Sequence, residues 1–464
     1  MVAAPSISYS ITVRLEIAPG GTAVSELTTT VEKAGGVVTA LDVAPSGANL
    51  RIDLTCATSG TDHADRVVDA LEALEDVDVA KVSDRTFLMH LGGVIETKAK
   101  HPLRNRDDLS MIYTPGVARI SQAIAADRED ARRLTIKRNS VAVVSDGSAV
   151  LGLGNVGAYA ALPVMEGKSA LFKSFADIDA WPLCLDTQDV DQIVETVAAI
   201  APGFGGINLE DISAPRCFEI EARLRERLDI PVFHDDQHGT AIVVLAALRN
   251  ALRVVDKRIE DVRVVMAGAG AAGTAILRLL VESGLSDVVV CDVAGVVHAG
   301  RGDTDQSLQW IATNTNRGGL TGALKDVLPG ADVFVGVSAP DLIDADDVAA
   351  MAEGAIVFAL ANPDPEIDPV VARRHATVVA TGRSDHPNQI NNVLAFPGIF
   401  RGLLDAQSRG IDSAVLLAAA NAIASTVGDD ELSANYIVPS VFHPDVHKKV
   451  ASAVRDAATE AARR

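Results

Sequence analysis

The sequence predicts an α/β protein with a Rossmann-type, doubly wound parallel sheet domain, an α/β domain before it, and a small N-terminal βαββαβ domain. Strand-like and helical segments alternate through the second half of the chain, which is typical of a parallel sheet covered by helices on both faces. The first ninety residues instead show two strand–helix–strand units in succession. A chain of 464 residues is also too long for one core. We expect domains at 1–90, 91–250 and 251–434, with helices at about 435–464 packing back on the second.

The N-terminal domain is predicted from alternating apolar residues and turn signals. Its expected strands are 7–17, 37–43, 49–55 and 77–85, and its expected helices are 22–34 and 63–74. This order resembles an ACT domain, a regulatory fold that often binds amino acids between paired copies. In such domains the loop before the first helix, here Ala18-Pro19-Gly20-Gly21, contacts ligand. The resemblance implies a small-molecule effector; a dimerising appendage without a ligand is the alternative.

Charge and cysteine content limit the partners and the compartment. The formal net charge is −21, from 41 basic and 62 acidic residues. Nucleic acid and anionic membranes are therefore not expected as partners, because both attract basic patches. The four cysteines form no CxxC pair, which favours a reducing compartment over a disulfide framework. Neither a secretory signal nor an apolar run of membrane-spanning length is visible, and we expect a cytoplasmic protein.

Two acidic pairs stand out in the second domain, where helices and longer loops dominate the pattern. Glu210-Asp211 and Asp235-Asp236 each follow an apolar, strand-like stretch. Each pair therefore lies where a strand opens into a loop. Adjacent carboxylates at such ends suit a hard, oxygen-seeking cation, so we expect Mg²⁺ or Mn²⁺. Helix capping by Asp235 and Asp236 is the alternative interpretation.

A dinucleotide site is predicted at VRVVMAGAGAAG, where a strand (263–266), a glycine turn and a helix (271–283) follow in order. Gly268 permits the tight turn, Gly270 lets backbone approach pyrophosphate, and Gly273 brings the helix close to the strand. The first helical residues, Ala271 and Ala272, offer backbone N–H groups to the phosphates. Later strands of the same sheet are expected at 288–291, 333–337, 356–360 and 377–381.

The cofactor is inferred from Asp292, which ends the strand after the glycine turn. A carboxylate there can bind both ribose hydroxyls and would repel a 2′-phosphate unless a basic side chain stood beside it. No Lys or Arg follows before Arg301. The sequence therefore favours NAD, with NADP the less favoured cofactor.

A second GxGxxG string, LGLGNVG, contains Gly152, Gly154 and Gly157. Pro163 is expected to interrupt any helix six residues after the last glycine, and no clean second strand is apparent. We interpret this string as a close-packed loop at the substrate site, not as a second nucleotide site.

Two residues are candidates for proton transfer. Tyr113 lies just before a Pro-Gly turn, and a phenol held in a turn can donate a proton. Lys168 follows Gly167; a lysine that is partly desolvated beside a divalent metal tends to lose its proton and become a general base. Lys173 is the rival base, and a solvated Lys or a packed Tyr is the commoner role. We interpret His234 and His238 as hydrogen-bonding loop residues.

Taken together, these strings resemble those of a known family. YTPGVA, DGSAVLGLGNVG, GKSALFK, NLEDISAP, FHDDQHGTA, GAGAAG, ANPDPE and NQINNVLAFPG occur in this order in malic enzymes of the compact bacterial type. The resemblance covers about residue 98 to the C-terminus. It implies oxidative decarboxylation of (S)-malate to pyruvate and CO₂ with reduction of the nicotinamide, and at least a homodimer.

The resemblance also implies roles for single residues. Glu210, Asp211 and Asp236 would be the metal ligands, with Asp235 beside them at the substrate. Lys168 would take the C2 hydroxyl proton as hydride leaves, and Tyr113 would protonate C3 of the resulting enol. Two further residues, Asn362 and Asn392, would contact the substrate carboxylate or the nicotinamide amide.

One position departs from the larger animal-type members, which carry an arginine just before the LGLG string to hold malate. Here Ala149 and Val150 stand at that place, as in the compact members. Arg104 and Arg119 are candidates for the missing clamp. Three other functions remain open: a malolactic reaction that releases lactate, a catalytically inactive sensor acting through the N-terminal domain, and a metal-independent hydroxy-acid dehydrogenase.

Overall fold

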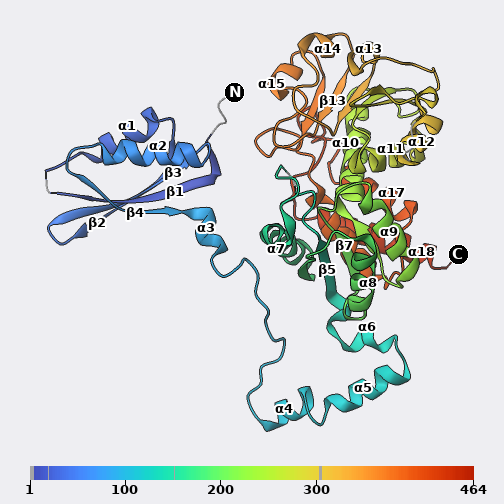
Figure 1. The fold of residues 1–464 in the computed structure, drawn as a ribbon, viewed down its shortest axis with the longest axis horizontal. Coiled ribbons are helices and arrows are strands. Elements are labelled where there is room, and N and C mark those ends of the chain that lie inside the picture. The colour runs from blue at the N-terminus through green and yellow to red at the C-terminus, as the bar shows by residue number, and fades with distance from the viewer. Residues whose placement is uncertain (1–4, 19, 151, 303–305, 464) are drawn as a thin grey trace. The chain divides into compact units, whose positions relative to one another are not determined.

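The computed structural model describes residues 5–18, 20–150, 152–302 and 306–463 (Figure 1). The chain forms two compact units, Met1–Lys98 and Ala99–Arg464. The smaller unit holds an antiparallel sheet, and the larger unit holds two sheets whose main strands are parallel. The predicted α/β fold class is confirmed. The division into three domains at residues 90, 250 and 434 stays a prediction.

The smaller unit has the predicted βαββαβ order. Its elements are β1 (Ser6–Ile17), α1 (Val24–Lys33), β2 (Val37–Ser46), β3 (Asn49–Thr58), α2 (Thr61–Glu72), β4 (Val77–Asp84) and a short α3 (Arg85–His90). The strands lie in the order β2-β3-β1-β4, and all neighbours are antiparallel. Helices α1 and α2 bury their apolar stripes in a core that belongs to this unit alone. Pro19, in the loop expected to contact an effector, lies outside the described residues, and the likeness to an ACT domain stays a prediction.

The larger unit begins with an arm, by which we mean residues 99–129. The arm contains α4 (Arg106–Ile112) and α5 (Val117–Ala126), and neither helix buries a residue. Helix α4 packs on α5, and α5 packs on α6 (Asp130–Leu134), which leads into the rest of the unit. Figure 1 shows α4 and α5 lying apart from both parallel sheets. In a single chain, the arm is therefore largely uncovered.

A four-stranded parallel sheet follows the arm. Its strands are β5 (Ser140–Ser145), β6 (Asp179–Cys184), β7 (Gly206–Leu209) and β8 (Val232–His234), in the order β6-β5-β7-β8. The crossover helices are α7 (Gly157–Ala176), α8 (Val190–Ile200) and α9 (Arg216–Arg227). Because β7 and β8 are parallel neighbours, with Leu209 opposite His234, their carboxyl ends meet at one edge.

The structure corrects the expectation for the segment after LGLGNVG. Helix α7 begins at Gly157 and continues through Pro163 to Ala176, and a second strand, β6, follows it. A proline inside a helix leaves the carbonyl four residues earlier without its N–H partner. Here that residue is Tyr159, which is 88% exposed, so water can reach its carbonyl. The cost of the proline is small on this face of the helix. Leu151, inside the string, lies outside the described residues.

The second parallel sheet has the order β11-β10-β9-β12-β13-β14. Its strands are β9 (Arg263–Ala267), β10 (Asp287–Asp292), β11 (Gly295–Val296), β12 (Val333–Gly336), β13 (Ile356–Ala359) and β14 (Val378–Thr381). Only the two-residue β11 is antiparallel to its neighbour among these strands. The flanking helices are α10 (Thr240–Val254), α11 (Ala271–Glu282), α12 (Gln306–Asn314), α13 (Leu324–Val327), α14 (Ala345–Ala349) and α15 (Pro369–Ala372). This is the doubly wound sheet that the alternating pattern predicts.

The three C-terminal helices are α16 (Phe396–Asp405), α17 (Ser413–Ala424) and α18 (Val446–Ala461). Of these helices, α16 and α18 return to α7. Helices α16 and α18 approach so closely that a Cβ added at Gly402 would lie 2.5 Å from the Ala451 carbonyl oxygen. The Phe172 ring of α7 lies 4.7 Å from that of Phe396 and 5.3 Å from that of Phe400, centroid to centroid. These contacts hold α7 against the rest of the unit.

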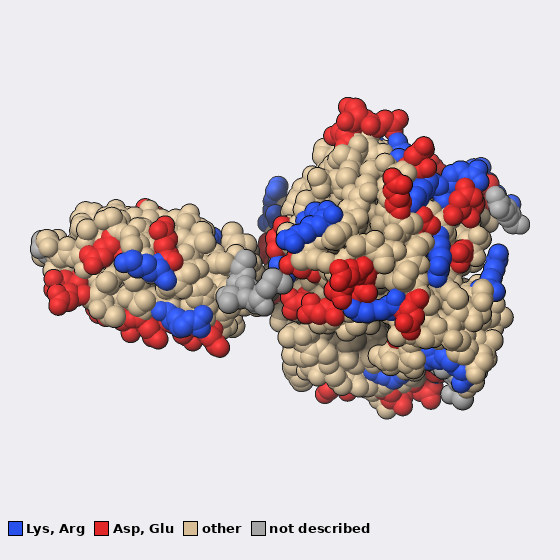
Figure 2. All heavy atoms as spheres, turned by 90° about the horizontal axis from the view of Figure 1, so that it is seen from above, with Lys and Arg blue, Asp and Glu red and all other residues tan. Residues whose placement is uncertain are grey.

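The surface shows mixed charge. On the face drawn in Figure 2, acidic and basic side chains of the larger unit lie interspersed, and no broad basic patch gathers among the residues described there. Within the described part of the chain, no helix combines the length and apolar character needed to cross a membrane.

Candidate active site

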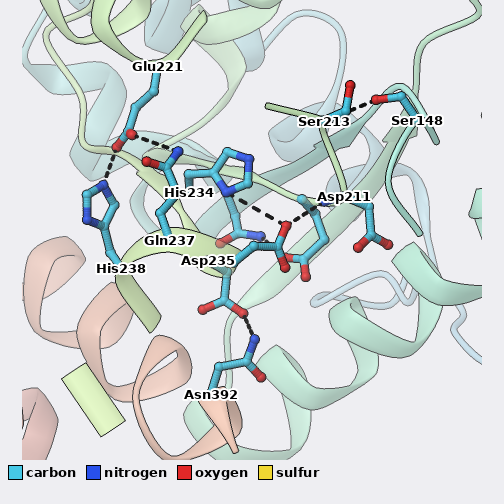
Figure 3. A network of polar contacts seen from close by, with 12 residues as sticks. Ser148, Asp211, Ser213, Glu221, His234, Asp235, Gln237, His238 and Asn392 are labelled. Atoms are coloured by element: carbon cyan, nitrogen blue, oxygen red, sulfur yellow. Dashed lines mark hydrogen bonds and ion pairs between the residues drawn. The ribbon is translucent and has the colours of Figure 1, made fainter. Parts of the chain in front are cut away.

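The two acidic pairs meet at the edge where β7 and β8 end. Glu210 and Asp211 directly follow β7, and Asp235 and Asp236 begin a short π-helical turn, η3 (Asp235–Gly239), directly after β8. One carboxylate oxygen from each of Glu210, Asp211 and Asp236 lies within 4.8 Å of the others. The backbone N–H of Asp211 donates to Asp236 Oδ2 at 2.9 Å, which ties the two loops together. Figure 3 shows Asp211 and Asp235 on these two loops, with the Asp235 carboxylate directed toward Asn392.

The close approach of these buried carboxylates disfavours their negatively charged forms when no cation is present. Burial, with the nearby carboxylates, raises the pKa of Glu210 well above its usual range. Burial first, and Asp236 second, raise the pKa of Asp211 to about 7. Asp211 Oδ2 is buried and accepts no hydrogen bond from the described residues. Three carboxylates with a spare buried oxygen are a donor set that fits a hard divalent cation, because such ions take oxygen ligands.

Lys168 reaches into the same cluster from α7. Its side chain is 8% exposed, and Nζ lies 2.8 Å from Glu210 Oε1 and 2.6 Å from Asp235 Oδ2. Nζ also lies 4.3 Å from the centre of the Phe396 ring. Burial lowers the pKa of Lys168, but Asp235 and Glu210 outweigh burial, and the net pKa is raised. From the sequence we expect burial beside a cation to lower it; in the protein alone, the two carboxylates reverse that direction.

Asp235 links Lys168 on α7 to Asn392, which lies before α16. Its Oδ2 accepts one hydrogen bond from Lys168 Nζ and another from the Asn392 side-chain amide, and Figure 3 shows the second of these. Asn392 begins the short turn η5 (Asn392–Leu394) before α16. A Cβ added at Gly239 would lie 2.0 Å from Asp235 Oδ1, so only glycine fits at that position of the turn. The structure thus brings Lys168, Asp235 and Asn392 together.

A buried acid behind the cluster supports η3. Glu221, on α9, lies 2.7 Å from His238 Nε2 and accepts from Gln237 Nε2 at 3.4 Å (Figure 3). Burial raises the pKa of Glu221, but His238, His234 and Arg225 together outweigh burial and the net pKa is lowered. His238 is a hydrogen-bonding residue, as expected. His234 differs: its ring nitrogens make no hydrogen bond to described residues, and Nδ1 lies 3.7 Å from Asp236 Oδ2.

Two supporting groups were missed from the sequence. Glu221 lies in the middle of a helix whose pattern gives no sign of a function. Asp146 follows β5 directly and pairs with Arg216 Nη1 at 2.7 Å, while Ser148 Oγ accepts from the Ser213 N–H at 2.9 Å. The signal for Asp146 was present, because it ends a buried strand as Glu210 and Asp235 do.

The glycine turn after β9 has the geometry of a phosphate cradle. Gly268 adopts φ +118°, and a Cβ there would lie 2.7 Å from the Val337 carbonyl oxygen. A Cβ at Gly273 would lie 2.0 Å from the Gly268 carbonyl oxygen, so the helix packs directly on the turn. Gly270 faces open space, and α11 starts at the next residues, Ala271 and Ala272. An anion approaching Gly270 would meet the N-terminal end of α11.

Asp292, at the end of β10, forms a two-point ion pair with Arg301. Arg301 Nη2 lies 2.7 Å from Oδ2 and Nη1 lies 2.9 Å from Oδ1. The inference that the first basic residue after Asp292 is too distant to act beside it is therefore wrong; the chain turns back through β11. Arg301 also lines a cavity of about 630 Å³ with His298 and Val293.

The loops after β12 and β13 are joined by Glu366. Its buried carboxylate accepts from the Ser338 N–H at 2.9 Å and the Ala361 N–H at 3.1 Å. A Cβ at Gly336 would lie 2.3 Å from Glu366 Cδ. This clamp fixes the loop that carries Asn362, whose side-chain amide donates to the Leu360 carbonyl at 3.3 Å.

Matches to known families decide which chemistry these parts serve. Residues 92–225 match the malic enzyme N-terminal domain, and residues 237–459 match the malic enzyme NAD-binding domain. The chain belongs to the malic enzyme family. It is 55% identical over 454 residues to the NAD-dependent malic enzyme of Geobacillus stearothermophilus, a match that covers 97% of this chain and 95% of the relative. It is 54% identical over 371 residues to a bifunctional malic/malolactic enzyme of Bacillus subtilis, covering 79% of this chain and 90% of the relative.

Solved malic enzyme structures show the same fold. The crystal structure of the NAD-dependent malic enzyme from Thermotoga maritima superposes with a TM-score of 0.78 at 47% identity, covering 80% of this chain and 99% of the other. The malic enzyme from Pyrococcus horikoshii Ot3 gives a TM-score of 0.77 at 47% identity, covering 80% of this chain and 88% of the other.

Tyr113 does not join the malic enzyme site within one chain. It caps the C-terminal end of α4 in the arm, and its side chain is 66% exposed. Arg104 and Arg119, the candidates for a malate clamp, also belong to the arm and are exposed. The single chain therefore assembles the carboxylates, Lys168 and the glycine turn, but not the group expected to protonate carbon.

Proposed function

We propose that this protein is an NAD-dependent malic enzyme that converts (S)-malate to pyruvate and CO₂ while it reduces NAD, with Mg²⁺ or Mn²⁺. The observation that carries the proposal is the buried cluster of Glu210, Asp211 and Asp236 with Lys168 against it. The cluster lies in the same unit as a glycine turn of dinucleotide-binding form. The near full-length similarity to an NAD-dependent malic enzyme supports the same reaction.

In this proposal, Glu210, Asp211 and Asp236 hold the cation. When bound, the cation supplies a Lewis acid that orients the hydroxy acid and draws charge from its C2 oxygen. Three neighbouring acids with raised pKa values for Glu210 and Asp211 are consistent with a site built around a positive charge.

Lys168 and Asp235 would move the first proton. Lys168 Nζ takes the proton of the substrate C2 hydroxyl as hydride leaves C2 for the nicotinamide. Because Nζ already donates to Asp235 Oδ2, it can pass one of its own protons to that carboxylate at the same time. Burial raises the pKa of Asp235, which makes its carboxylate a suitable acceptor. Asn392 holds Asp235 from the other side and faces the substrate in this arrangement.

The cofactor would lie along the turn after β9. Gly268, Gly270 and Gly273 leave room for pyrophosphate at the N-terminal end of α11, where Ala271 and Ala272 offer backbone N–H groups. Asp292 would accept the ribose hydroxyls while Arg301 holds its carboxylate in place. Asn362 lies beyond β13, where the nicotinamide amide is expected. Tyr113 would protonate C3 of the enol left after CO₂ departs.

The direct test is NADH absorbance with (S)-malate and Mn²⁺, run in parallel with NAD and NADP, with pyruvate and CO₂ measured as products. We expect NADH and pyruvate in equal amounts, and no turnover after the metal is removed with EDTA. The control is Lys168→Arg, which keeps the charge between Glu210 and Asp235 but is a poor proton acceptor. We expect its kcat to fall by roughly a hundredfold or more while NADH still binds. Turnover that persists in EDTA would instead support a metal-independent dehydrogenase.

A second candidate reaction is the malolactic conversion of malate to lactate, because the relative from Bacillus subtilis is described as a bifunctional malic/malolactic enzyme. Malate consumed to lactate without net NADH would support it. The oligomer and compartment are also part of the proposal: a homodimer or higher homo-oligomer in the cytoplasm, with a small-molecule effector at the smaller unit.

A further inference from the structure

Asp211, a member of the carboxylate cluster, has a backbone conformation that few residues with a side chain adopt. Its φ is +54°, in the left-handed region. Such a conformation persists where the surrounding structure holds it. The Asp211 N–H donates to Asp236 Oδ2 at 2.9 Å, and the Asp211 carbonyl accepts from the Ala149 N–H at 2.9 Å. The first contact comes from η3 and the second from the loop after β5, so both loops hold the Asp211 backbone.

The loop after β5, residues 146–150, is held by a buried acid. The Asp146 side chain is fully buried, and its Oδ1 accepts from the N–H and the Oγ of Ser148 at 3.0 and 2.5 Å. Ser148 Oγ in turn accepts from the Ser213 N–H at 2.9 Å, a contact that Figure 3 shows. Because Ser213 is two residues after Asp211, these bonds join the loop after β5 to the loop after β7 on the far side of Asp211.

Arg216, the first residue of α9, strengthens the same connection with its guanidinium. Nη1 lies 2.7 Å from Asp146 Oδ2 and donates to the Gln188 carbonyl at 2.7 Å, while Nη2 donates to Ser213 Oγ at 2.9 Å. A guanidinium can make these contacts at once, because its N–H groups point in fixed directions. It also supplies the positive charge that a buried carboxylate such as Asp146 needs. One side chain thus binds both loops.

We propose that Asp146 and Arg216 are positioning residues that fix the orientation of the Asp211 carboxylate for a divalent cation. This inference rests on the proposed metal-dependent function. Neither residue belongs to the cluster of three carboxylates; both act through Ser148, Ser213 and the Asp211 backbone. Groups that orient the ligands of a metal contribute to its affinity, and their loss commonly weakens metal binding by about tenfold to a hundredfold.

The first test is Mn²⁺ binding to the full-length, metal-free protein, with free Mn²⁺ measured by electron paramagnetic resonance. Arg216→Gln removes the charge and the link between the loops, and we expect the Mn²⁺ dissociation constant to rise by about tenfold or more. Arg216→Lys keeps the charge but cannot reach Asp146 and Ser213 together, so we expect an intermediate rise. A purely structural role would lower the melting temperature and leave the Mn²⁺ dissociation constant of the folded protein unchanged, which would overturn the proposal.

The matched control is Arg223→Gln, on the same helix. Arg223 lies 2.7 Å from Asp191 Oδ1 and 3.1 Å from Glu219 Oε1, and its side chain is 36% exposed. Neither partner belongs to the loops after β5 and β7, so we expect the Mn²⁺ dissociation constant to stay within about twofold of wild type. Equal weakening by Arg223→Gln and Arg216→Gln would attribute the effect to the lost charge on α9, and would overturn the positioning role.

Two further variants keep the test decisive if Arg216→Gln does not fold. Ser148→Ala leaves the Asp146–Arg216 pair in place but removes the acceptor of the Ser213 N–H, and we expect Mn²⁺ to bind about threefold to tenfold more weakly. Asp146→Asn acts on the same connection. Combining it with Ser148→Ala should therefore weaken Mn²⁺ binding no more than the more severe single change. Additive losses, or unchanged Mn²⁺ affinity in both single variants, would overturn the proposal.

The same measurements separate this inference from the proposed reaction. Wild-type protein that binds Mn²⁺ but does not oxidise malate would contradict the proposed reaction alone, and the Mn²⁺ dissociation constants of the variants would still decide the positioning role. Wild-type protein that binds no Mn²⁺ would overturn both proposals. NADH affinity, followed by fluorescence, should be the same in wild type and in Arg216→Gln, because the hydrogen bonds of Arg216 do not involve the glycine turn after β9.

Discussion

The Asp211 carboxylate is buried, and a negative charge in a buried position is energetically costly. Burial and Asp236 raise its pKa to about 7, from 3.8 for the free side chain. The folded chain therefore binds a proton at pH values where the unfolded chain has released it. A rise of this size corresponds to an unfolding free energy that falls by about 4 kcal/mol between about pH 4 and about pH 7. We expect the melting temperature of the metal-free protein to fall as the pH rises through this range, as measured by thermal unfolding in EDTA.

Saturating Mn²⁺ should remove this trend, because the cation binds the deprotonated carboxylates and stabilises the folded state. Asp211→Asn is the matched control: it should weaken the pH dependence in EDTA and also weaken stabilisation by Mn²⁺. A melting temperature that stays constant with pH in EDTA would show that these acids are not held at raised pKa values.

Arg301 bears on cofactor choice. Its two-point pair with Asp292 keeps that carboxylate in place. Burial raises the pKa of Asp292, but the hydrogen bonds from Arg301 and the Ala294 N–H, together with the Arg301 charge, outweigh burial, and the net pKa is lowered. Asp292→Ser combined with Val293→Lys removes the negative charge and adds a cation beside the guanidinium. We expect the ratio of kcat/KM for NADP to that for NAD to rise by about tenfold or more, equivalent to about 1.4 kcal/mol. An unchanged ratio would place cofactor selection in another loop.

Some of these residue-scale features follow from the sequence and others do not. The convergence of Glu210, Asp211, Asp235 and Asp236 was predictable, because both acidic pairs end strand-like segments and parallel strands end at one edge. The Asp292–Arg301 pair was not, since it depends on how a short strand, β11, reverses the chain. Lys168 was found as a candidate base, but its two carboxylate partners come from segments about 40 and 70 residues away, so no local pattern reveals the direction of its pKa.

Helix α16 depends on close backbone contact with α18. A Cβ at Gly402 would lie 2.5 Å from the Ala451 carbonyl oxygen and 2.8 Å from Val454 Cβ, so Gly402→Ala forces the two helices apart. We expect it to lower the free energy of unfolding by about 1–3 kcal/mol in chemical denaturation. The control is Gly167→Ala on α7, where nothing lies within 4 Å of the added carbon. That change should be neutral or stabilise by up to about 1 kcal/mol. Equal effects of the two changes would contradict tight α16–α18 packing.

At the scale of elements, hydrophobic periodicity predicts the strands of the second parallel sheet and of the smaller unit closely. It fails at α7, where Pro163 and the small residues of the LGLG string suggest a loop. The helix forms nevertheless, because its buried side packs on β5 and α16 and the proline faces outward. Tertiary packing there outweighs the local signal.

The whole molecule consists of two units with separate cores. The smaller unit buries its own apolar residues, including Val13, Leu15 and Leu54, in a cluster that contains no residue of the larger unit. We expect a chain that starts at Ala99 to fold and to keep malate-dependent NADH formation, as measured by circular dichroism and by kcat for each subunit. Solved relatives that match about 80% of this chain are consistent with this expectation. Loss of folding would show that the units depend on one another.

At this scale, the sequence predicts the α/β class and the order of the parts, but not the placement of the arm. The residues of α4 and α5 show helical spacing and apolar content like those of any packed helix. Only the structure shows that neither helix buries a residue against the described residues of the larger unit.

The contact between Gly336 and Glu366 restricts which amino-acid substitutions can accumulate at these two positions, and in which order. Any side chain at position 336 would overlap the Glu366 carboxylate, and loss of that carboxylate alone would leave the Ser338 and Ala361 N–H groups without their acceptor. Each substitution is harmful alone, and only a coordinated pair could replace them. Evolutionary drift at these two positions should therefore be epistatic, with the glycine and the acid lost together or not at all.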